Sequence, residues 1–136
     1  MSAIDPNKIA TQTFDGGLIK WLVTPDNAEG AGVTLGEVVV QPGIGQDRRY
    51  HPESEEILYV LSREGEQMLD DGEPFQGKAG DIIYVPNAVF HSTINTGWKP
   101  IRVLPLYNPA GPEKALEELP DFREVPPGKL PQWERA

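Results

Sequence analysis

The two histidines of the chain, His51 and His91, are the residues best suited to chemistry. They are the only histidines among 136 residues. An imidazole can ligate a metal ion or transfer a proton near neutral pH, although a single histidine in a strand more often serves structure. Each of these histidines, however, lies inside a longer pattern of glycine, acidic and amide residues. That context favours a functional site over two structural histidines.

The two patterns have definite spacings. The first runs Gly43, five residues, Arg49-Tyr50-His51, four residues, Glu56, and six residues to Arg63. The second runs Gly80, five residues, Pro86-Asn87-Ala88, two residues, His91, three residues and Asn95. Together they resemble the two motifs of the cupin superfamily, whose members are small jelly-roll barrels. The resemblance extends over about residues 33–107.

The sequence departs from the cupin motifs at three positions. Arg49 stands where the first motif usually has its first histidine, and Arg63 stands where its closing glycine is usual. Ala88 occupies a glycine position of the second motif. Because the jelly-roll fold hosts many reactions, the resemblance specifies the fold better than the reaction.

The resemblance also implies a metal site. Cupins hold a metal with two histidines and a glutamate from the first motif and one histidine from the second, which here implies His51, Glu56 and His91. Two imidazoles and one carboxylate resemble the facial triad of non-haem Fe(II) oxygenases. We therefore expect a metal-dependent enzyme, with Fe(II) preferred as cofactor and dioxygenation as the first hypothesis. The alternatives are a non-redox isomerase, lyase or decarboxylase using Mn, Ni or Zn as a Lewis acid, and a metal-free binding or sensing module.

Arg49, with Glu56, is expected to contribute to catalysis. Strand alternation puts Arg49 on the same face as His51, so its side chain should point into the barrel. There its guanidinium can clamp a substrate carboxylate or enolate. Alternatively, it replaces the charge of the metal and pairs with Glu56, since it has no lone pair for coordination. Both interpretations imply a small anionic substrate or ligand.

Two other glutamates are rival ligands. Glu55 fits the shorter spacing that some cupins show after the histidine, and Glu53 could face inward if the strand continued past Pro52. The register of the apolar run that follows Glu56 makes Glu56 the better choice. Glu53 and Glu55 are therefore expected to be solvated loop charges.

The composition excludes several classes of protein. A net charge of −9 repels nucleic-acid phosphates and anionic lipids, so neither nucleic acid nor membrane is an expected partner. The absence of cysteine excludes disulfides, thiolate catalysis and cysteine-ligated metals. The N-terminal residues lack the apolar run of a signal peptide, and no stretch is long enough to span a bilayer. We expect a cytoplasmic protein.

Short strands are the elements that must position these residues. The chain has 14 glycines and 14 prolines, which favour strands and turns over a helical bundle. Strands are expected at 18–24, 33–41, 48–51, 56–62, 66–69, 81–85, 89–94 and 101–107, and a helix at 112–119. The sequence therefore predicts one all-β domain over residues 1–136. It is a jelly-roll barrel with its core at about 33–107, an N-terminal arm, and a C-terminal helix and tail at 110–136.

The strands at 56–61 and 81–85 are apolar on both faces. One face can fill the barrel, and the other needs cover from the N-terminal arm, the C-terminal tail or a second subunit. Together with the frequent dimerisation of the small cupins that the chain resembles, this pattern leads us to expect a homodimer.

Overall fold

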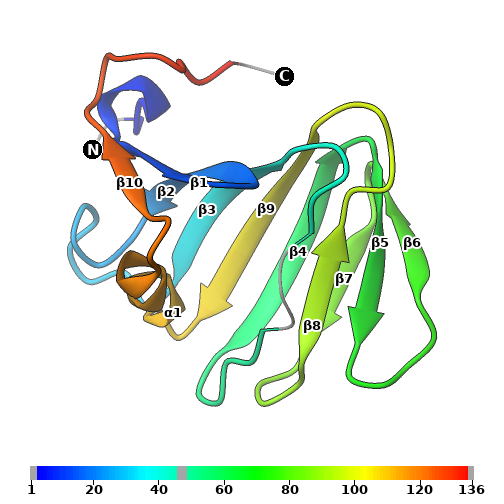
Figure 1. Cartoon of the computed structure of the whole chain (residues 1–136). Helices are drawn as coiled ribbons and strands as arrows, with labels where there is room; N and C mark the ends of the chain where they lie inside the picture. The colour runs from blue at the N-terminus through cyan, green and yellow to red at the C-terminus, as the bar shows by residue number, and fades with distance from the viewer. Residues whose placement is uncertain (1–2, 46–48, 135–136) are drawn as a thin grey trace.

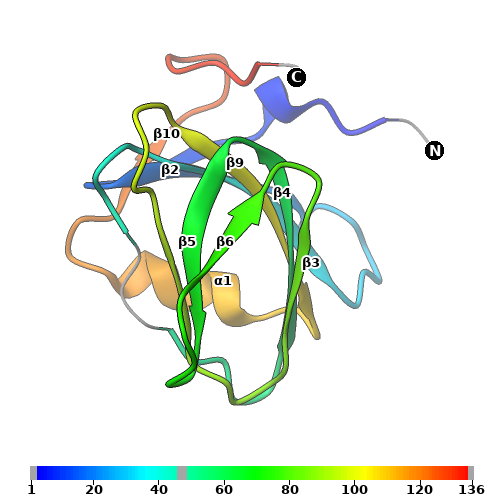
Figure 2. The same cartoon turned by 90° about the vertical axis from the view of Figure 1, so that its right-hand side faces the viewer.

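The computed structural model describes residues 3–45 and 49–134, which form two antiparallel sheets (Figure 1). The strands are β1 (Thr11–Phe14), β2 (Gly17–Val23), β3 (Thr34–Val40), β4 (Glu55–Ser62), β5 (Glu64–Leu69), β6 (Phe75–Lys78), β7 (Ile82–Val85), β8 (His91–Ile94), β9 (Ile101–Asn108) and β10 (Arg123–Val125). One sheet has the order β10-β1-β2-β3-β9-β4-β7, and the other has the order β6-β5-β8. The sheets face each other and enclose a barrel interior, as Figure 2 shows from the side. The predicted all-β jelly-roll fold is confirmed.

The barrel is filled by side chains that alternate along the strands of the larger sheet. In β4 the inward residues Glu56, Leu58 and Val60 are buried, whereas Ile57 and Tyr59 between them are exposed. In β9 the buried positions include Ile101, Val103 and Tyr107. This period of two is the pattern of a sheet with one packed face. The apolar core comprises Ile19, Trp21, Val38, Val40, Leu58, Val60, Ile83, Val85, Ile101, Val103, Tyr107 and Leu116.

The N-terminal and C-terminal segments are part of the larger sheet rather than appendages. The predicted N-terminal arm contributes β1, which pairs with β2 on one side and with β10 on the other. It begins with a short 3-10 turn, η1 (Pro6–Lys8). The extended segment expected at 48–51 starts at Arg48, which lies outside the described residues, and Arg49 forms an isolated backbone bridge with His91.

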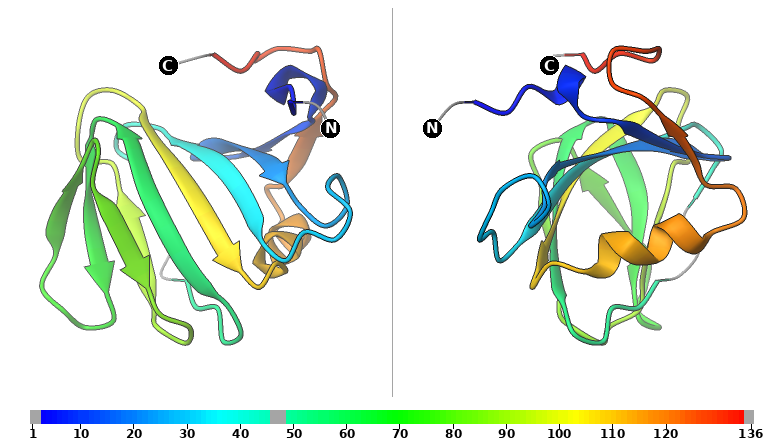
Figure 3. Two further views of the ribbon diagram at one scale, coloured as in Figure 1. Left: turned by 180° about the vertical axis from the view of Figure 1, so that it is seen from behind. Right: turned by 90° about the vertical axis from the view of Figure 1, so that its left-hand side faces the viewer.

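The predicted helix at 112–119 is shorter than expected. It consists of α1 (Pro112–Ala115) followed by a 3-10 turn, η2 (Leu116–Glu118). Leu116 reaches the core, and the buried Glu113 carboxylate accepts hydrogen bonds from Thr34 Oγ1 at 2.5 Å and from the Gly111 amide at 3.0 Å. These contacts fix the C-terminal segment against the open side of the barrel (Figure 3). None of the described helices is long or apolar enough to cross a membrane.

The outer side of β9, β4 and β7 carries an exposed apolar face. Ile57 pairs with Tyr84 and Leu106, and Tyr59 pairs with Ile82 and Leu104, so the six side chains share one side of the sheet. Ile82 is 65% exposed and Tyr84 is 51% exposed. The N-terminal and C-terminal segments lie over the other end of this sheet (Figure 3). Of the three covers expected for this face, the described residues of the N-terminal arm and the C-terminal tail leave it exposed, and a second subunit remains a prediction.

We propose that this apolar face binds the same face of a second copy, since a patch of this kind usually marks an interface. Ile82 is the most exposed of the four exposed residues on this face. Ile82→Glu would bury a charge in the dimer interface and should therefore convert a dimer into a monomer. Light scattering coupled to gel filtration measures the mass directly. Leu130→Glu introduces the same charge at an apolar residue that is 81% exposed in the C-terminal tail, and it should leave the dimer intact. A monomeric wild-type protein at micromolar concentration would refute this proposal.

Candidate metal centre

Backbone pairing brings the segment that carries His51 and Glu56 close to His91, which is distant in sequence. Glu56 lies near the start of β4 in the larger sheet, whereas His91 begins β8 in the smaller sheet. The Arg49 amide donates to the His91 carbonyl at 2.8 Å, and the His91 amide donates to the Arg49 carbonyl at 2.9 Å. The Ala88 amide donates to the His51 carbonyl at 3.0 Å. These bonds hold the segment carrying Arg49 and His51 against the strand that carries His91.

The side chains of His51, Glu56 and His91 converge inside the barrel. His91 Nε2 lies 2.9 Å from Glu56 Oε1, and His51 Nε2 lies 3.5 Å from the same oxygen. One donor atom from each residue lies within 4.8 Å of the other two. The two imidazole centroids are 5.3 Å apart, and Glu56 is only 3% exposed. The group is therefore compact and largely sealed from solvent.

Unsatisfied polar atoms show that this group suits a cation. His51 Nε2, Glu56 Oε1 and His91 Nδ1 are buried without a hydrogen-bond partner among the described residues. The 2.9 Å approach of His91 Nε2 to Glu56 Oε1 lacks the alignment of a hydrogen bond. Buried polar atoms without partners are rare, and an absent ion is one explanation of them. A divalent ion that bonds imidazole nitrogen and carboxylate oxygen at about 2.1 Å would satisfy His51 Nε2 and Glu56 Oε1, and His91 would bind it through Nε2, the nitrogen that faces Glu56.

The charge of Glu56 also fits a metal ligand. Burial raises the pKa of its carboxyl, but the two neighbouring imidazoles lower the pKa by more in combination. The net pKa lies below the ordinary value, so the group is a carboxylate at neutral pH. A buried carboxylate beside two imidazoles is the composition of a divalent-metal site.

Arg49 lies between two cavities. With Glu56 and Tyr107 it lines a small interior cavity of about 20 Å³. It also lines an outer cleft of about 370 Å³ beside the β1–β2 turn, Ile44 and residues 119–121. No ion pair joins Arg49 to Glu56, whose carboxylate contacts the two histidines among the described residues. The interpretation in which Arg49 neutralises Glu56 by direct pairing therefore has no contact to support it.

Tyr107 is a site residue that the sequence analysis missed. Its ring stands edge-on to His51 with the centroids 5.1 Å apart, and it lines the interior cavity. Burial raises the pKa of its hydroxyl well above the ordinary value, the Glu56 carboxylate raises it further, and Arg49 opposes them. Tyr107 is therefore a neutral phenol. The alternating pattern of 101–107 places Tyr107 on the inward face of the strand, and this position could have identified it as a candidate.

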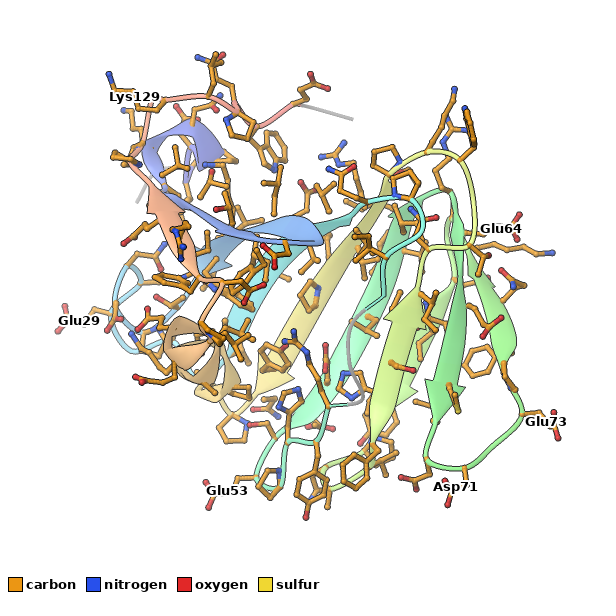
Figure 4. The ribbon with its side chains drawn as sticks, viewed as in Figure 1. Glu29, Glu53, Glu64, Asp71, Glu73 and Lys129 are labelled. Carbon is orange, nitrogen blue, oxygen red and sulfur yellow. The ribbon has the colours of Figure 1, made fainter. Side chains whose placement is uncertain are left out.

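The structure places the two rival glutamates outside the group. Glu53 is exposed on the turn after His51, and Figure 4 labels it at the tip of the barrel. Glu55 accepts hydrogen bonds from Tyr84 Oη and Asn108 Nδ2, both at 2.8 Å, on the outer side of the sheet. Neither carboxylate faces His51 or His91, so among the three glutamates only Glu56 joins the histidines.

Two of the departures from the motifs share one backbone feature. Arg63 has φ 68° and Ala88 has φ 63°, so both adopt the left-handed conformation that glycine enters without strain. Glycine is usual at both positions in the family that the sequence resembles. Both turns therefore have the backbone conformation of a glycine turn, although arginine and alanine occupy the two positions.

Known proteins give the same picture of the fold. The Cupin domain family model matches residues 36–107. An uncharacterised protein of Methanocaldococcus jannaschii is 37% identical over 92 residues, which cover 68% of this chain and 73% of that protein. Polyketide synthase CurC of Streptomyces cyaneus is 30% identical over 114 residues, which cover 83% of this chain and 73% of CurC.

A solved structure of Bacillus subtilis oxalate decarboxylase, a protein with Mn(II) centres, superposes with a TM-score of 0.65. It is 24% identical, and the match covers 79% of this chain and 31% of that chain. At this identity the superposition supports the fold alone. The motifs, the two facing sheets and the matched family model together establish that the chain belongs to the cupin domain family.

Proposed function

We propose that this protein is a metal-dependent enzyme that acts on an organic anion. His51, Glu56 and His91 would hold the metal, and Arg49 would bind the anionic group of the substrate. The observation that carries the proposal is the convergence of His51 Nε2, Glu56 Oε1 and His91 Nε2, of which the first two are buried without a hydrogen-bond partner among the described residues. A bound divalent metal supplies Lewis-acid polarisation of a substrate oxygen.

The substrate would bind in the outer cleft. The interior cavity of about 20 Å³ has room for about one water molecule, whereas the cleft of about 370 Å³ is in the range of small-molecule sites. Apolar side chains dominate its lining, among them Phe14, Ile19, Val38, Ile44 and Leu119. The cleft therefore suits an apolar carbon skeleton whose charged end reaches Arg49.

The residues around the cavity would then have separate tasks. The Arg49 guanidinium can hold a carboxylate or enolate through two parallel hydrogen bonds. Tyr107 stays protonated and offers a neutral hydroxyl in a space that admits little water. Leu116 and the surrounding core line the interior cavity and exclude bulk solvent from it, which strengthens the electrostatic interactions of Arg49 on its inner side.

The reaction class that we favour is non-redox chemistry through an enolate, such as isomerisation, elimination or decarboxylation. The name of one similar protein, polyketide synthase CurC, supports a carbonyl-containing substrate, whose enolate is an organic anion. A second candidate is dioxygenation, which the composition of two histidines and one glutamate favours for Fe(II). Both candidates need the same metal site and differ in whether O₂ is consumed.

Metal-reconstituted protein separates the two candidates. Apoprotein is loaded with Mn(II), Ni(II), Zn(II) or, without oxygen, Fe(II), and is then mixed with a panel of 2-oxo and 3-oxo carboxylates in D₂O. We expect metal-dependent deuterium exchange at the carbon next to the carbonyl, measured by NMR, without O₂ uptake. Substrate-dependent O₂ uptake with Fe(II) alone would instead establish dioxygenation.

The matched control is Arg49→Ala with the same metals. Because Arg49 would bind substrate and not metal, this variant should keep its metal and raise KM by roughly tenfold through the lost charge-assisted bond. Wild-type protein that binds no metal under any of these conditions would overturn the enzyme proposal and favour a metal-free binding module.

A further inference from the structure

A second group of charged side chains lies at the barrel end opposite the metal centre. Glu56 lies near the start of β4, and Arg63 directly follows its end. Seven residues of extended chain separate the two positions by roughly 23 Å. A hollow of about 520 Å³ opens at the far end, between the β4–β5 turn, the β6–β7 turn and the β8–β9 loop. Figure 4 labels Glu64 at this end and Glu53 at the other. The lining residues with charged, amide or aromatic side chains are Arg63, Glu64, Lys78, Asn95, Trp98 and Lys99.

The hollow is cationic in a chain that is strongly anionic overall. Arg63, Lys78 and Lys99 line it together with a single acid, Glu64, whereas the net charge of the chain is −9. The ion pairs of the described residues involve none of these three cations. The nearby Asp81 carboxylate accepts the Lys78 backbone amide at 2.8 Å and so closes the turn. The hollow therefore has an excess of unneutralised positive charge.

The backbone does not account for the arginine in this group. Arg63 has φ 68°, a left-handed conformation that strains a residue with a Cβ atom but does not strain glycine. Its carbonyl accepts the Ala79 amide at 2.9 Å, which fixes the turn in that conformation. Strained residues of this kind tend to lie at functional sites. The turn itself therefore does not require arginine at this position.

Trp98 stands on a loop that is built to hold it in place. The side-chain amide of Asn95, 1% exposed, donates to Val40 O at 2.9 Å and to Lys99 O at 2.8 Å. Asn95 Oδ1 accepts the Gly97 amide at 2.9 Å. The indole of Trp98 is 91% exposed, so this ordered loop presents an uncovered aromatic surface. An exposed aromatic ring on an ordered loop beside cations can serve as a stacking platform for a charged ring.

We propose that this hollow binds a small planar aromatic molecule that carries two or more negative charges. The ring stacks on Trp98, and the negative groups contact Arg63, Lys78 and Lys99. The fork of the Arg63 guanidinium matches a carboxylate, sulfonate or phosphate group. The site is separate from His51, Glu56 and His91 and does not depend on the reaction proposed there.

Naphthalenedisulfonate has the required ring and charges, and ethanedisulfonate carries the same charges without the ring. Calorimetric titration of the full chain at low salt measures both. We expect Arg63→Gly to weaken naphthalenedisulfonate binding by roughly tenfold, because one charge-assisted contact is lost. Its melting temperature should stay equal or rise, because glycine relieves the strained φ. Trp98→Ala should weaken naphthalenedisulfonate by roughly threefold to tenfold and leave ethanedisulfonate unchanged.

Two further variants locate the binding. Lys129→Ala removes an exposed cation from the C-terminal tail and should bind as wild type does. Arg49→Ala should also bind naphthalenedisulfonate as wild type does. Weaker binding by this variant would show that the probe occupies the cleft beside the metal centre. Wild-type affinity in Arg63→Gly, or equal affinity of the wild type for the two probes, would overturn the proposal.

Discussion

The His91→Ala variant will purify as a folded protein that no longer retains a metal. His91 Nε2 lies 2.9 Å from Glu56 Oε1 and its Nδ1 has no hydrogen-bond partner among the described residues, so the substitution removes one of the two imidazoles that face the buried carboxylate and leaves the other in place. Metal at a hundred times its Kd stabilises a protein by about 2.7 kcal/mol, which raises the melting temperature of a chain this long by about 9 °C. The wild type should show that shift, and the variant should show less than about a tenth of it.

Elemental mass spectrometry supplies the second measurement. Wild type purified without chelator should contain about one divalent ion per chain, and the variant less than about a tenth. Glu53→Gln is the matched control, because it removes a carboxylate that is exposed and near in sequence but not in the group. Full occupancy in His91→Ala, or equal loss in Glu53→Gln, would show that the metal is held elsewhere.

The Arg49→His variant will bind metal more tightly than wild type. Arg49 and His91 are directly paired in an antiparallel bridge, and side chains of paired residues lie on the same side of a sheet. An imidazole at position 49 would therefore face the other donors and add a fourth ligand, while the repulsion of a guanidinium disappears. We expect Kd to fall by about tenfold or more, which corresponds to about 1.4 kcal/mol.

Arg49→Ala separates the two causes of this tightening. It removes the repulsion without adding a ligand, so its affinity should lie between those of wild type and Arg49→His. Competition with a fluorescent chelator measures all three values. If Arg49→His binds no more tightly than Arg49→Ala, position 49 does not face the metal. Both variants should lose affinity for an anionic substrate, because neither has a guanidinium.

The sequence predicts the fold and the converging side chains because spacing encodes both. A strand with alternating burial fixes which side chains face inward, so the register of the apolar run is enough to distinguish Glu56 from Glu55. The motif that contains His91 follows at a separation that resembles that of one family, and this resemblance implies that His91 meets His51 and Glu56. The structure brings these three side chains together.

Other features depend on tertiary packing, which spacing does not encode. Tyr107 looks like one more apolar strand residue until the barrel closes and its ring meets His51. The outer cleft exists because residues 119–121 come to lie near the β1–β2 turn, a contact that no local pattern indicates. Glu113 belongs to an acidic helix whose pattern predicts solvated carboxylates, yet its hydrogen bond with Thr34 holds it in the interior. The apolar run of β4 does not indicate which face of the strand packs into the barrel and which stays exposed.

The pairing of β1 with β10 determines when the larger sheet can be completed during synthesis. Thr11 pairs with Val125, so β1 remains an unpaired sheet edge until β10 has been synthesised. Leu116, which packs into the interior, also follows the strands β1 to β9 in the chain. A nascent chain therefore carries an open sheet edge and an incompletely covered apolar interior until residues 116–125 have left the ribosome, and such edges promote aggregation. A ribosome that stalls before these residues would leave a species prone to aggregate.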